Sequence, residues 1–574
     1  MQIIINGKSY QAKKNQPVLQ VALDNNIYIP HFCYHEDLEV EANCRTCLVE
    51  IVKPGLDTKE KAGEIVTSCT LKASEGLEIN TQSKKAIALR QENLSLLLSH
   101  HKFNCSTCPR GSICAVNEAI VKDKVNITKY RSTPTDMPVV TLGNAVEFDS
   151  NVCIACNQCV KVCEEIGIGY LKLEGNGVYN RVVATDDPTI DCIYCGQCTV
   201  HCPVAAIREQ THLTQVEEAI NDPSKIVIAQ MAPSVRVSIG ELFKMEIGKN
   251  IEKKLNTAFR QIGFDKIFDV NFGADITTLV EANELINRIE NNGVMPMFTS
   301  CCPAWVKFIE FYYPEMIPHL TTVRSPQIHA GGAYKTWWAE KEDIDPKNIV
   351  VVSIMPCTSK KYEASHKKLK INDMFPVDYV LTTRETATLI KRHKIDLKTI
   401  SSSEPDALGE YSGAGAIYGA SGGVMESALR TISYQLLKKD IGRLEFTEVR
   451  GMEGIKKATV TLADKELHVA VVATPKNARI ILEEIKNSPK AYDYIEFMAC
   501  PGGCIGGGGQ PIPNTKRIIK KRTEGLYQID SIKSCHSAHE NKLAVEFIEY
   551  CHHQSKEKSD QLLYTTYSKK QRGE

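Results

Sequence analysis

The sequence predicts a multidomain protein in which small α+β units are followed by a large α/β domain. Its 574 residues are enough for about three to five domains. The 22 cysteines are unevenly placed: fifteen lie before residue 203, none between 203 and 300, and seven after that. From about residue 209, apolar β-branched stretches alternate with helical ones, as in a mainly parallel sheet. We therefore expect a cysteine-dense front and a larger α/β back.

Composition limits the classes of function. Lys plus Arg and Asp plus Glu both number 69, so no excess charge indicates a nucleic-acid or membrane-surface partner. No apolar run approaches the roughly 18–20 residues of a membrane helix, and the first residues, MQIIINGKSY, lack the features of a signal peptide. The expected location is the cytoplasm. Disulfides are rare there, so clustered cysteines indicate metal ligands or redox groups.

The first cysteine set is Cys33, Cys44, Cys47 and Cys69. It lies among the strand-like stretches QIIING and CLVEIV, with the helical VALDNN between them, and resembles the β-grasp ferredoxin that carries a [2Fe–2S] cluster. Plant-type ferredoxins have four residues between the first two cysteines, whereas here there are ten. The set is therefore more similar to the N-terminal domain of iron-only hydrogenases and of the large iron–sulfur subunit of NADH dehydrogenase. A zinc site is the alternative.

The second set lies in HKFNCSTCPRGSIC and consists of His101, Cys105, Cys108 and Cys114. One imidazole and three thiolates could hold zinc. In the two families just named, a similar stretch follows the β-grasp domain and binds a [4Fe–4S] cluster. His100 is adjacent and could substitute, but the family spacing of three residues before the first cysteine favours His101.

The third and fourth sets both have the spacing C-x₂-C-x₂-C-x₃-C. The ligands are Cys153, Cys156, Cys159 and Cys163 in CIACNQCVKVC, and Cys192, Cys195, Cys198 and Cys202 in CIYCGQCTVHCP. At this spacing three cysteines bind one [4Fe–4S] cube and the fourth binds the other cube. Cys202 is therefore expected to join the third set, and Cys163 the fourth.

These four sets amount to sixteen ligands, enough for one [2Fe–2S] and three [4Fe–4S] clusters with none left over. Four clusters in series predict an electron wire between a redox site and an external carrier. The expected domains are residues 1–80 with the [2Fe–2S] cluster, 81–140 with the His–Cys₃ cluster, 141–208 with two [4Fe–4S] clusters, and 209–574 with the redox site.

The back of the chain places four more cysteines directly after predicted strands. The strands are expected at residues 225–230, 266–271, 294–298, 348–354, 378–381 and 492–497. Ligand sites in parallel sheets form beyond the carboxyl ends of the strands. Cys302, Cys357, Cys500 and Cys504 all fall there, so we expect them to converge on one crevice. The glycine-rich stretches lack nucleotide-binding fingerprints and are interpreted as close backbone approach to a bulky cofactor.

Three stretches identify the family. FTSCCPAW, MPCTSKKYE and EFMACPGGCIGGGGQP resemble the signature motifs of [FeFe]-hydrogenases in order and spacing, and MAPSVR and SGAGAIYGASGGVMESALR extend the match. The resemblance covers nearly the whole chain, including the four-cluster front of clostridial-type monomeric enzymes. It implies an enzyme that reversibly reduces protons to H₂ with electrons from ferredoxin or flavodoxin. It also implies maturation proteins that supply part of the cofactor.

That cofactor is the H-cluster, a [4Fe–4S] cube joined through a cysteine sulfur to a two-iron unit with CO, cyanide and a bridging dithiolate amine. The resemblance implies that Cys302, Cys357, Cys500 and Cys504 hold the cube and that Cys504 bridges the two parts. Lys360 is expected to donate to one cyanide. The other implied pocket residues are Ala232, Pro233, Ser234, Pro326, Gln327, Met355, Tyr418, Gly419 and Met498.

The family also implies a route for protons. Glu281, Glu284 and Arg288 fall on one face of a predicted helix, a pattern that by itself is more typical of a surface salt-bridge stripe. In the family this face is a proton relay that ends at Cys301. Thr321 occupies a position where relatives commonly have serine, and Tyr418 one where they usually have phenylalanine.

Three rivals remain at this point. One is the catalytic subunit of an electron-bifurcating NADH/ferredoxin hydrogenase complex, which needs flavin-bearing partners. Another is a non-catalytic relative for H₂ sensing or cluster assembly, but such relatives lose Cys301 or parts of the signature. A subunit of NADH dehydrogenase would share the front and lack the three H-cluster motifs. Cys535 and Cys551 fit no motif and are interpreted as ordinary thiols, and the polar tail after about residue 553 as surface-bound or mobile.

Overall fold

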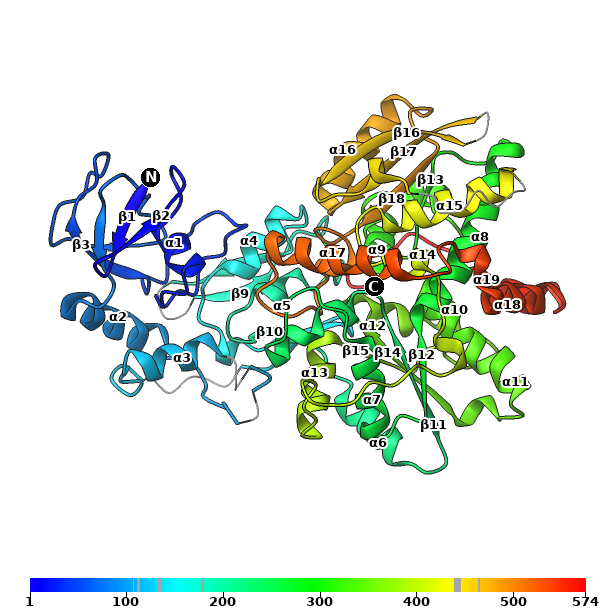
Figure 1. Ribbon diagram of the computed structural model, residues 1–574, viewed down its shortest axis with the longest axis horizontal. Coiled ribbons are helices and arrows are strands. Elements are labelled where there is room, and N and C mark those ends of the chain that lie inside the picture. Colours follow the sequence, from blue (N-terminus) through cyan, green and yellow to red (C-terminus); the bar gives the residue numbers. More distant parts are fainter. Residues whose placement is uncertain (107, 111–113, 132–136, 177–179, 438–444, 463–464) are drawn as a thin grey trace.

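The computed structural model describes the chain except for residues 107, 111–113, 132–136, 177–179, 438–444 and 463–464. The first elements form a separate unit on the left of Figure 1, a smaller cysteine-rich region lies in the middle, and the large remainder fills the right. Among the helices of the described residues, none is long and apolar enough to cross a membrane.

The N-terminal unit is a five-stranded sheet in the order β2-β1-β5-β3-β4. Its strands are β1 (Gln2–Ile5), β2 (Lys8–Gln11), β3 (Leu48–Lys53), β4 (Ile65–Thr67) and β5 (Glu78–Asn80), with helix α1 (Val18–Asp24) between them in the chain. Asn6 and Gly7 join the first two strands with positive φ angles of 56° and 76°, as a tight hairpin requires. The alternating Ile3 and Ile5 point into the core beneath α1.

The middle region contains two copies of one small unit. Helix α4 (Gln158–Glu165) and helix α5 (Gln197–His201) each begin inside a cysteine motif, after Asn157 and Gly196 at φ angles of 68° and 70°. The left-handed residue turns the chain so that each motif wraps back on itself before its helix starts. The flanking elements are α2 (Lys84–Leu97), α3 (Ala115–Lys122), β6 (Val140–Leu142), β7 (Val146–Phe148), β8 (Leu171–Glu174), β9 (Arg181–Ala184) and β10 (Ile207–Glu209).

The large domain contains two four-stranded sheets, where the sequence suggested one. The first is wholly parallel, in the order β12-β11-β14-β15, with β11 (Ile226–Met231), β12 (Lys266–Asp269), β14 (Ile349–Met355) and β15 (Tyr379–Thr382). The second has the order β13-β18-β17-β16, with β13 (Met297–Phe298), β16 (Ile455–Leu462), β17 (Lys465–Ala473) and β18 (Tyr494–Met498). Periodicity locates strands but does not say which strands pair, so the split could not be read from the pattern.

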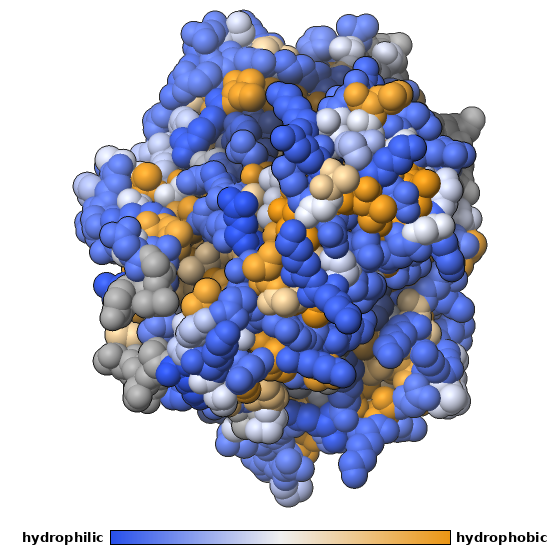
Figure 2. All heavy atoms as spheres, turned by 90° about the vertical axis from the view of Figure 1, so that its left-hand side faces the viewer, coloured by the Kyte–Doolittle hydropathy of each residue, from blue (hydrophilic) through white to orange (hydrophobic). Residues whose placement is uncertain are grey.

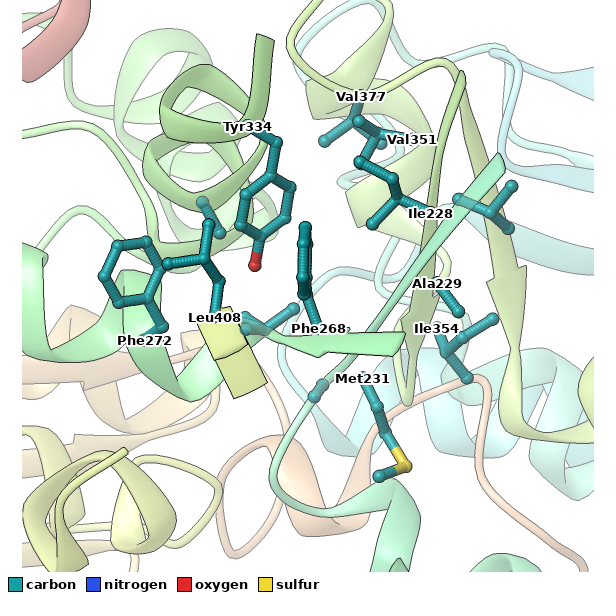
Figure 3. Close-up of a cluster of buried hydrophobic side chains, with 14 of the residues drawn as sticks. Ile228, Ala229, Met231, Phe268, Phe272, Tyr334, Val351, Ile354, Val377 and Leu408 are labelled. Atoms are coloured by element: carbon teal, nitrogen blue, oxygen red, sulfur yellow. The ribbon is translucent and has the colours of Figure 1, made fainter. Parts of the chain in front are cut away.

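Helix α8 (Val270–Glu290) follows β12 without a loop and has its first half buried on every side. The Asp269 side chain caps it by accepting a hydrogen bond from the Asn271 amide. It packs against α10 (Pro326–Ala333) and α15 (Gly423–Leu437). Beside its start, Phe268 and Tyr334 pack with ring centroids 4.8 Å apart in the cluster of Figure 3. The core therefore fixes this helix between the two sheets.

The remaining helices cover the two sheets (Figure 1). They are α6 (Leu213–Asn221), α7 (Glu252–Ile262), α9 (Pro303–Tyr312), α11 (Ala339–Lys341), α12 (Ser359–Ala364), α13 (Thr383–Arg392), α14 (Gly413–Ile417), α16 (Pro475–Asn487), α17 (Lys516–Ile532), α18 (Lys542–His552) and α19 (Lys556–Leu563). Pro303 occupies the first turn of α9, and Thr382 with Glu385 forms a capping box at α13. Residues 564–574 lie along the surface, where the Gly573 amide donates to Asp191.

Candidate active site and iron–sulfur ligands

Strand ends from both sheets open onto one buried cavity of about 50 Å³. The structure brings together all ten pocket residues named from the sequence, along with Cys301, Cys357 and Cys504. Sequence reasoning missed three lining residues, Val270, Ala274 and Pro356. The first two belong to α8, and the absence of a loop between β12 and this helix was not visible in the sequence. The cavity is mainly apolar, with few polar groups directed into it.

Four thiols meet at one side of this cavity. Cys302, Cys357 and Cys500 are buried, and burial raises the pKa of Cys302, Cys500 and Cys504. Each of these pKa values is raised further by neighbouring thiolates of the same set. No group of three His, Cys, Asp or Glu side chains among the described residues is arranged to hold a metal ion. The four thiolates repel one another, and thiolates are soft ligands that suit iron. A cationic iron–sulfur cube would neutralise their charge, so the set fits a cluster rather than a single ion.

Lys360 enters the cavity from α12 with its charge already partly paired. Its Nζ donates to the carbonyl oxygen of Cys301 at 3.0 Å and to Glu363 Oε2 at 2.9 Å. An ammonium group has three donors, so one remains for a bound group. Two other lining atoms, Ser234 Oγ and Gln327 Oε1, are buried without a hydrogen-bond partner among the described residues. These polar atoms on an apolar wall fit a compact cofactor with small polar ligands.

The glycine run at residues 506–509 approaches protein backbone. A Cβ at Gly508 would lie 2.4 Å from the carbonyl oxygen of Cys195 and 2.6 Å from Gly196 Cα. The loop that carries Cys504 is thus pressed against the second motif of the middle region. The close approach expected from the glycines is present, but among the described residues its partner is another loop.

We expect Gly508→Ala to separate these two loops, because a Cβ at 2.4 Å from a backbone oxygen forces the chain to shift. The expected result is an unfolding midpoint lower by several degrees and slower electron delivery to the site, measured by calorimetry and by reduction kinetics with dithionite. Gly240→Ala is the control, since its φ lies outside the left-handed region and the nearest atom to its Cβ position, Met245 Cβ, is 3.3 Å away. Equal behaviour of the two variants would contradict the tight contact.

The five residues expected in a proton relay comprise the half-buried Glu284 and Arg288 and the buried Glu281, Thr321 and Cys301. Thr321 Oγ1 donates to Glu284 Oε2 at 2.7 Å, and Arg288 Nε donates to Glu284 Oε1 at 3.0 Å. These three form a connected outer section. Glu281 is buried one helical turn further in and accepts a hydrogen bond from the Tyr494 hydroxyl at 2.9 Å. No hydrogen bond joins Glu281 to Cys301 or Thr321 in the described part of the chain.

Burial, with smaller contributions from Glu284 and Glu496, raises the pKa of Glu281 to about 8. Burial also raises the pKa of the Cys301 thiol, with an added contribution from Glu281. Both groups are therefore neutral acids near pH 7. The Tyr418 hydroxyl, a departure from the family pattern, lies 2.9 Å from Thr278 Oγ1, which in turn lies 2.9 Å from Ser427 Oγ.

Glu281→Gln should change how stability depends on pH. The carboxyl pKa is about 8 in the folded protein and near 4.5 in the unfolded chain, so the folded state holds the extra proton between these values. Wild-type stability should then fall by on the order of 4 kcal/mol as pH rises from about 5 to 9, and the glutamine variant should lack this loss. The unfolding midpoint of the glutamine variant should therefore rise relative to that of wild type as the pH increases across this range. Glu290→Gln, exposed on the same helix, is the control, and a constant difference at all pH values would be evidence against a raised pKa.

The thiols of the front face one another in the expected sets. Cys33 Sγ lies 3.2 Å from Cys44 Sγ, and the thiolates of Cys33 and Cys44 act on the pKa of Cys69. Cys202 raises the pKa of Cys153, Cys156 and Cys159, whereas Cys163 raises that of Cys192, Cys195 and Cys198. This arrangement agrees with the expected crossing of the fourth cysteine, and Cys202 also raises the pKa of Cys198 in the neighbouring set.

His101 is held in an orientation suited to a ligand. Its Nδ1 lies 2.8 Å from the carbonyl oxygen of Val152, and because a carbonyl only accepts, Nδ1 carries the proton. Nε2 is then free to bind a metal. Cys108 raises the pKa of Cys114, and Cys105 is exposed. Part of the loop between these cysteines, residues 107 and 111–113, lies outside the described residues.

Ferredoxin-like units that present grouped thiols, joined to a buried pocket with four more cysteines, define an iron–sulfur oxidoreductase. Comparison with known proteins makes this specific. Residues 225–508 match the family described as iron only hydrogenase large subunit, C-terminal domain. Residues 1–84 match a 2Fe-2S iron-sulfur cluster binding domain, and residues 516–570 match iron hydrogenase small subunit. The sequence reasoning had assigned no role to this last segment.

Relatives agree over the full length. The chain is 40% identical to iron hydrogenase 1 of Clostridium pasteurianum, with 99% of this chain and 100% of the relative covered. It is 35% identical to the NADP-reducing hydrogenase subunit HndD of Solidesulfovibrio fructosivorans, with 99% of each chain covered. A solved [FeFe]-hydrogenase structure, described as showing stepwise H-cluster assembly, matches with a TM-score of 0.56 and 35% identity, covering 62% of this chain and 99% of that one.

The chain belongs to the [FeFe]-hydrogenase family, as its motifs suggested. It is an oxidoreductase that reduces protons to H₂, and it carries iron–sulfur clusters and an H-cluster. The ferredoxin-like N-terminal domain and the H-cluster domain of the predicted fold are confirmed. Cytosolic iron–sulfur assembly component 3 of Pongo abelii is a more distant match, at 28% identity over 65% of this chain.

Proposed function

We propose that this hydrogenase receives electrons from reduced ferredoxin or flavodoxin and passes them through one [2Fe–2S] and three [4Fe–4S] clusters to the H-cluster. The observation that carries this proposal is the continuity of the thiol sets. Cys44 of the first set acts on the pKa of Cys156, Cys198 on that of Cys159, and Cys195 on that of Cys500. Each expected cluster thus lies next to the following one.

The His101 set is proposed as a branch of this series. Arg110 is buried, and Cys202 and Cys114 both act to raise its pKa against the effect of burial. Its side chain therefore lies between this set and the cube bound by Cys202. The exposed Cys105 makes the branch accessible to an external carrier. On the face shown in Figure 2, hydrophobic residues occur in scattered groups among hydrophilic ones, which suits a transient rather than a permanent partner.

At the active site, we propose that Cys302, Cys357, Cys500 and Cys504 hold the cube of the H-cluster. When bound, the cofactor supplies the iron centre at which two protons and two electrons combine as H₂. The remaining Lys360 donor would bind a polar ligand of the two-iron unit, and the apolar wall excludes water. Ala232, Pro233, Ser234, Met355 and Met498 are among the wall residues that would hold it by packing.

Protons are proposed to reach the pocket through the relay. Arg288 and Glu284 collect them near the surface, Thr321 and Glu281 carry them inward, and Cys301 delivers them. Glu281 suits the central position because its raised pKa lets it both take and give a proton near neutral pH. Side-chain rotation or a water molecule must bridge the gap between Thr321 and Glu281. Cytoplasmic location and dependence on maturation proteins complete the proposal.

The test is anaerobic expression with the maturation proteins. We expect H₂ evolution from reduced viologen, CO and cyanide infrared bands, and iron sufficient for the four accessory clusters plus the H-cluster. Protein that carries its full complement of iron but shows neither the infrared bands nor H₂ evolution would contradict the proposal. Cys105→Ala should remove the paramagnetic signal of one cluster only, which tests the assignment of the His101 set separately.

A second candidate function is that of the catalytic subunit in a complex that also uses a nicotinamide cofactor. The full-length similarity to an NADP-reducing hydrogenase subunit favours it. The purified chain would then produce H₂ from reduced ferredoxin poorly alone and depend on added partner subunits and NADPH or NADH. Full activity of the isolated chain with ferredoxin would favour the first proposal.

A further inference from the structure

Glu281 has a partner that the proton relay does not include. Tyr494, the first residue of β18, is 0% exposed and donates its hydroxyl proton to Glu281 Oε1 at 2.9 Å. Glu281 is 2% exposed, so this bond is made away from water. In the described part of the chain, the Glu281 side chain has no other hydrogen bond. The carboxyl that must move protons between Cys301 and Thr321 is therefore turned toward a strand of the second sheet.

We propose that Tyr494 is a positioning residue for the proton relay: its hydroxyl sets the resting orientation of the Glu281 carboxyl and must release it for proton transfer toward Cys301. The inference rests on the proposed role of Glu281. The residue is well placed for this, because β18 continues directly into the loop of Cys500 and Cys504. One strand thus supports both the cofactor ligands and the relay.

The surroundings leave little else to orient this carboxyl. Six titratable or charged groups interact electrostatically with Glu281. They are Glu284 and Arg288 on α8, Tyr494 and Glu496 on β18, Cys301 after β13, and Tyr418 after α14. Glu284 is already bound by Thr321 and Arg288, and Glu496 accepts the amides of Gly422 and Met425. Tyr418 donates to or accepts from Thr278. Tyr494 alone is committed to Glu281.

The chemistry of the bond fixes the sign of its effect. A phenol that donates to a carboxylate stabilises the charged form, so Tyr494 holds the pKa of Glu281 lower than burial alone would. When the carboxyl is protonated, the same donor lengthens its C=O bond and lowers its stretching frequency. A side chain that merely fills space would do neither.

Tyr494→Phe tests the proposal by infrared difference spectroscopy. The C=O band of protonated Glu281 is first identified by its loss in Glu281→Gln. In Tyr494→Phe we expect this band at a higher wavenumber and its titration shifted upward by about half to one pH unit, the size of one hydrogen bond. The alkaline limb of H₂ evolution should shift in the same direction. These band measurements do not need turnover, so they distinguish a failure of this inference from a failure of the proposed proton relay.

Tyr492→Phe is the matched control. Two residues earlier, the buried Tyr492 donates to Oε2 of the partly exposed Glu484 at 2.7 Å, so the same substitution removes the same kind of bond away from the relay. Its Glu281 band should not move. An unchanged band and titration in folded Tyr494→Phe would overturn the proposal. If that variant does not fold, 3,5-difluorotyrosine at position 494 keeps the ring and strengthens the donor, and the band must then move to a lower wavenumber.

Discussion

Cys301→Ala is expected to lower H₂ turnover by a factor of about 10²–10⁴, the usual contribution of a positioned acid or base, while leaving the cofactor bound. Cys301 lines the cavity, and after burial the largest contribution to its raised pKa comes from Glu281, ahead of Cys504 and Cys302. In the proposed ligand set, Cys301 is the thiol left without a place on the cube. The methyl side chain of alanine cannot carry a proton, and the substitution removes only the sulfur atom.

Two measurements separate this role from a structural one. The CO and cyanide infrared bands of Cys301→Ala should keep their intensity, whereas H₂ evolution with reduced viologen should nearly vanish. Cys535→Ala is the matched control, because that thiol does not line the cavity and its Sγ lies 3.6 Å from the carbonyl oxygen of Ser537. Retained turnover in Cys301→Ala would show that protons reach the pocket without this thiol.

The neighbouring pair Cys301–Cys302 shows what the site prediction depended on: the residue pattern placed the cysteines after predicted strands, and the family resemblance divided the roles between the two thiols. Adjacent residues at the end of β13 and the start of α9 point in different directions, so one thiol can face the cysteine set and the other Glu281. The order of strand, cysteine and helix was visible in the sequence. The same holds for the ligand spacing of the front, where local turns with a left-handed residue fix the geometry within each motif.

What the sequence did not reveal depends on contacts between distant segments. Tyr494 lies 213 residues from Glu281, and nothing in the stretch DYIEF distinguishes its tyrosine from an ordinary buried aromatic residue. The contact of Gly508 with Cys195 is equally remote. The two-sheet arrangement was missed for the same reason, because β13 pairs with β18 almost 200 residues later. Long-range pairing has no local pattern.

Lys360→Met should weaken the binding of the two-iron unit. The lysine offers the one ammonium group among the lining residues of the cavity, and a hydrogen bond from a charged donor contributes about 1.5–3 kcal/mol. Its loss should lower occupancy of the two-iron unit by about tenfold or more, seen as weaker CO and cyanide bands. The four cysteines are untouched, so the iron of the cubes and their paramagnetic signals should remain. Lys367→Met, exposed on the surface, should leave the bands at full strength.

A complication in this variant can be resolved by a second substitution. Lys360 also pairs with Glu363, whose Oε2 accepts from Lys360 Nζ at 2.9 Å and from Gln327 Nε2 at 2.6 Å. Removing the lysine leaves a buried carboxylate without its cation, which costs roughly 3–5 kcal/mol of stability and could itself disturb the pocket. Lys360→Met with Glu363→Gln removes both charges and should recover the unfolding midpoint without recovering the infrared bands. Recovery of both would show that Lys360 acts only through its ion pair, and that the cofactor needs no charge from it.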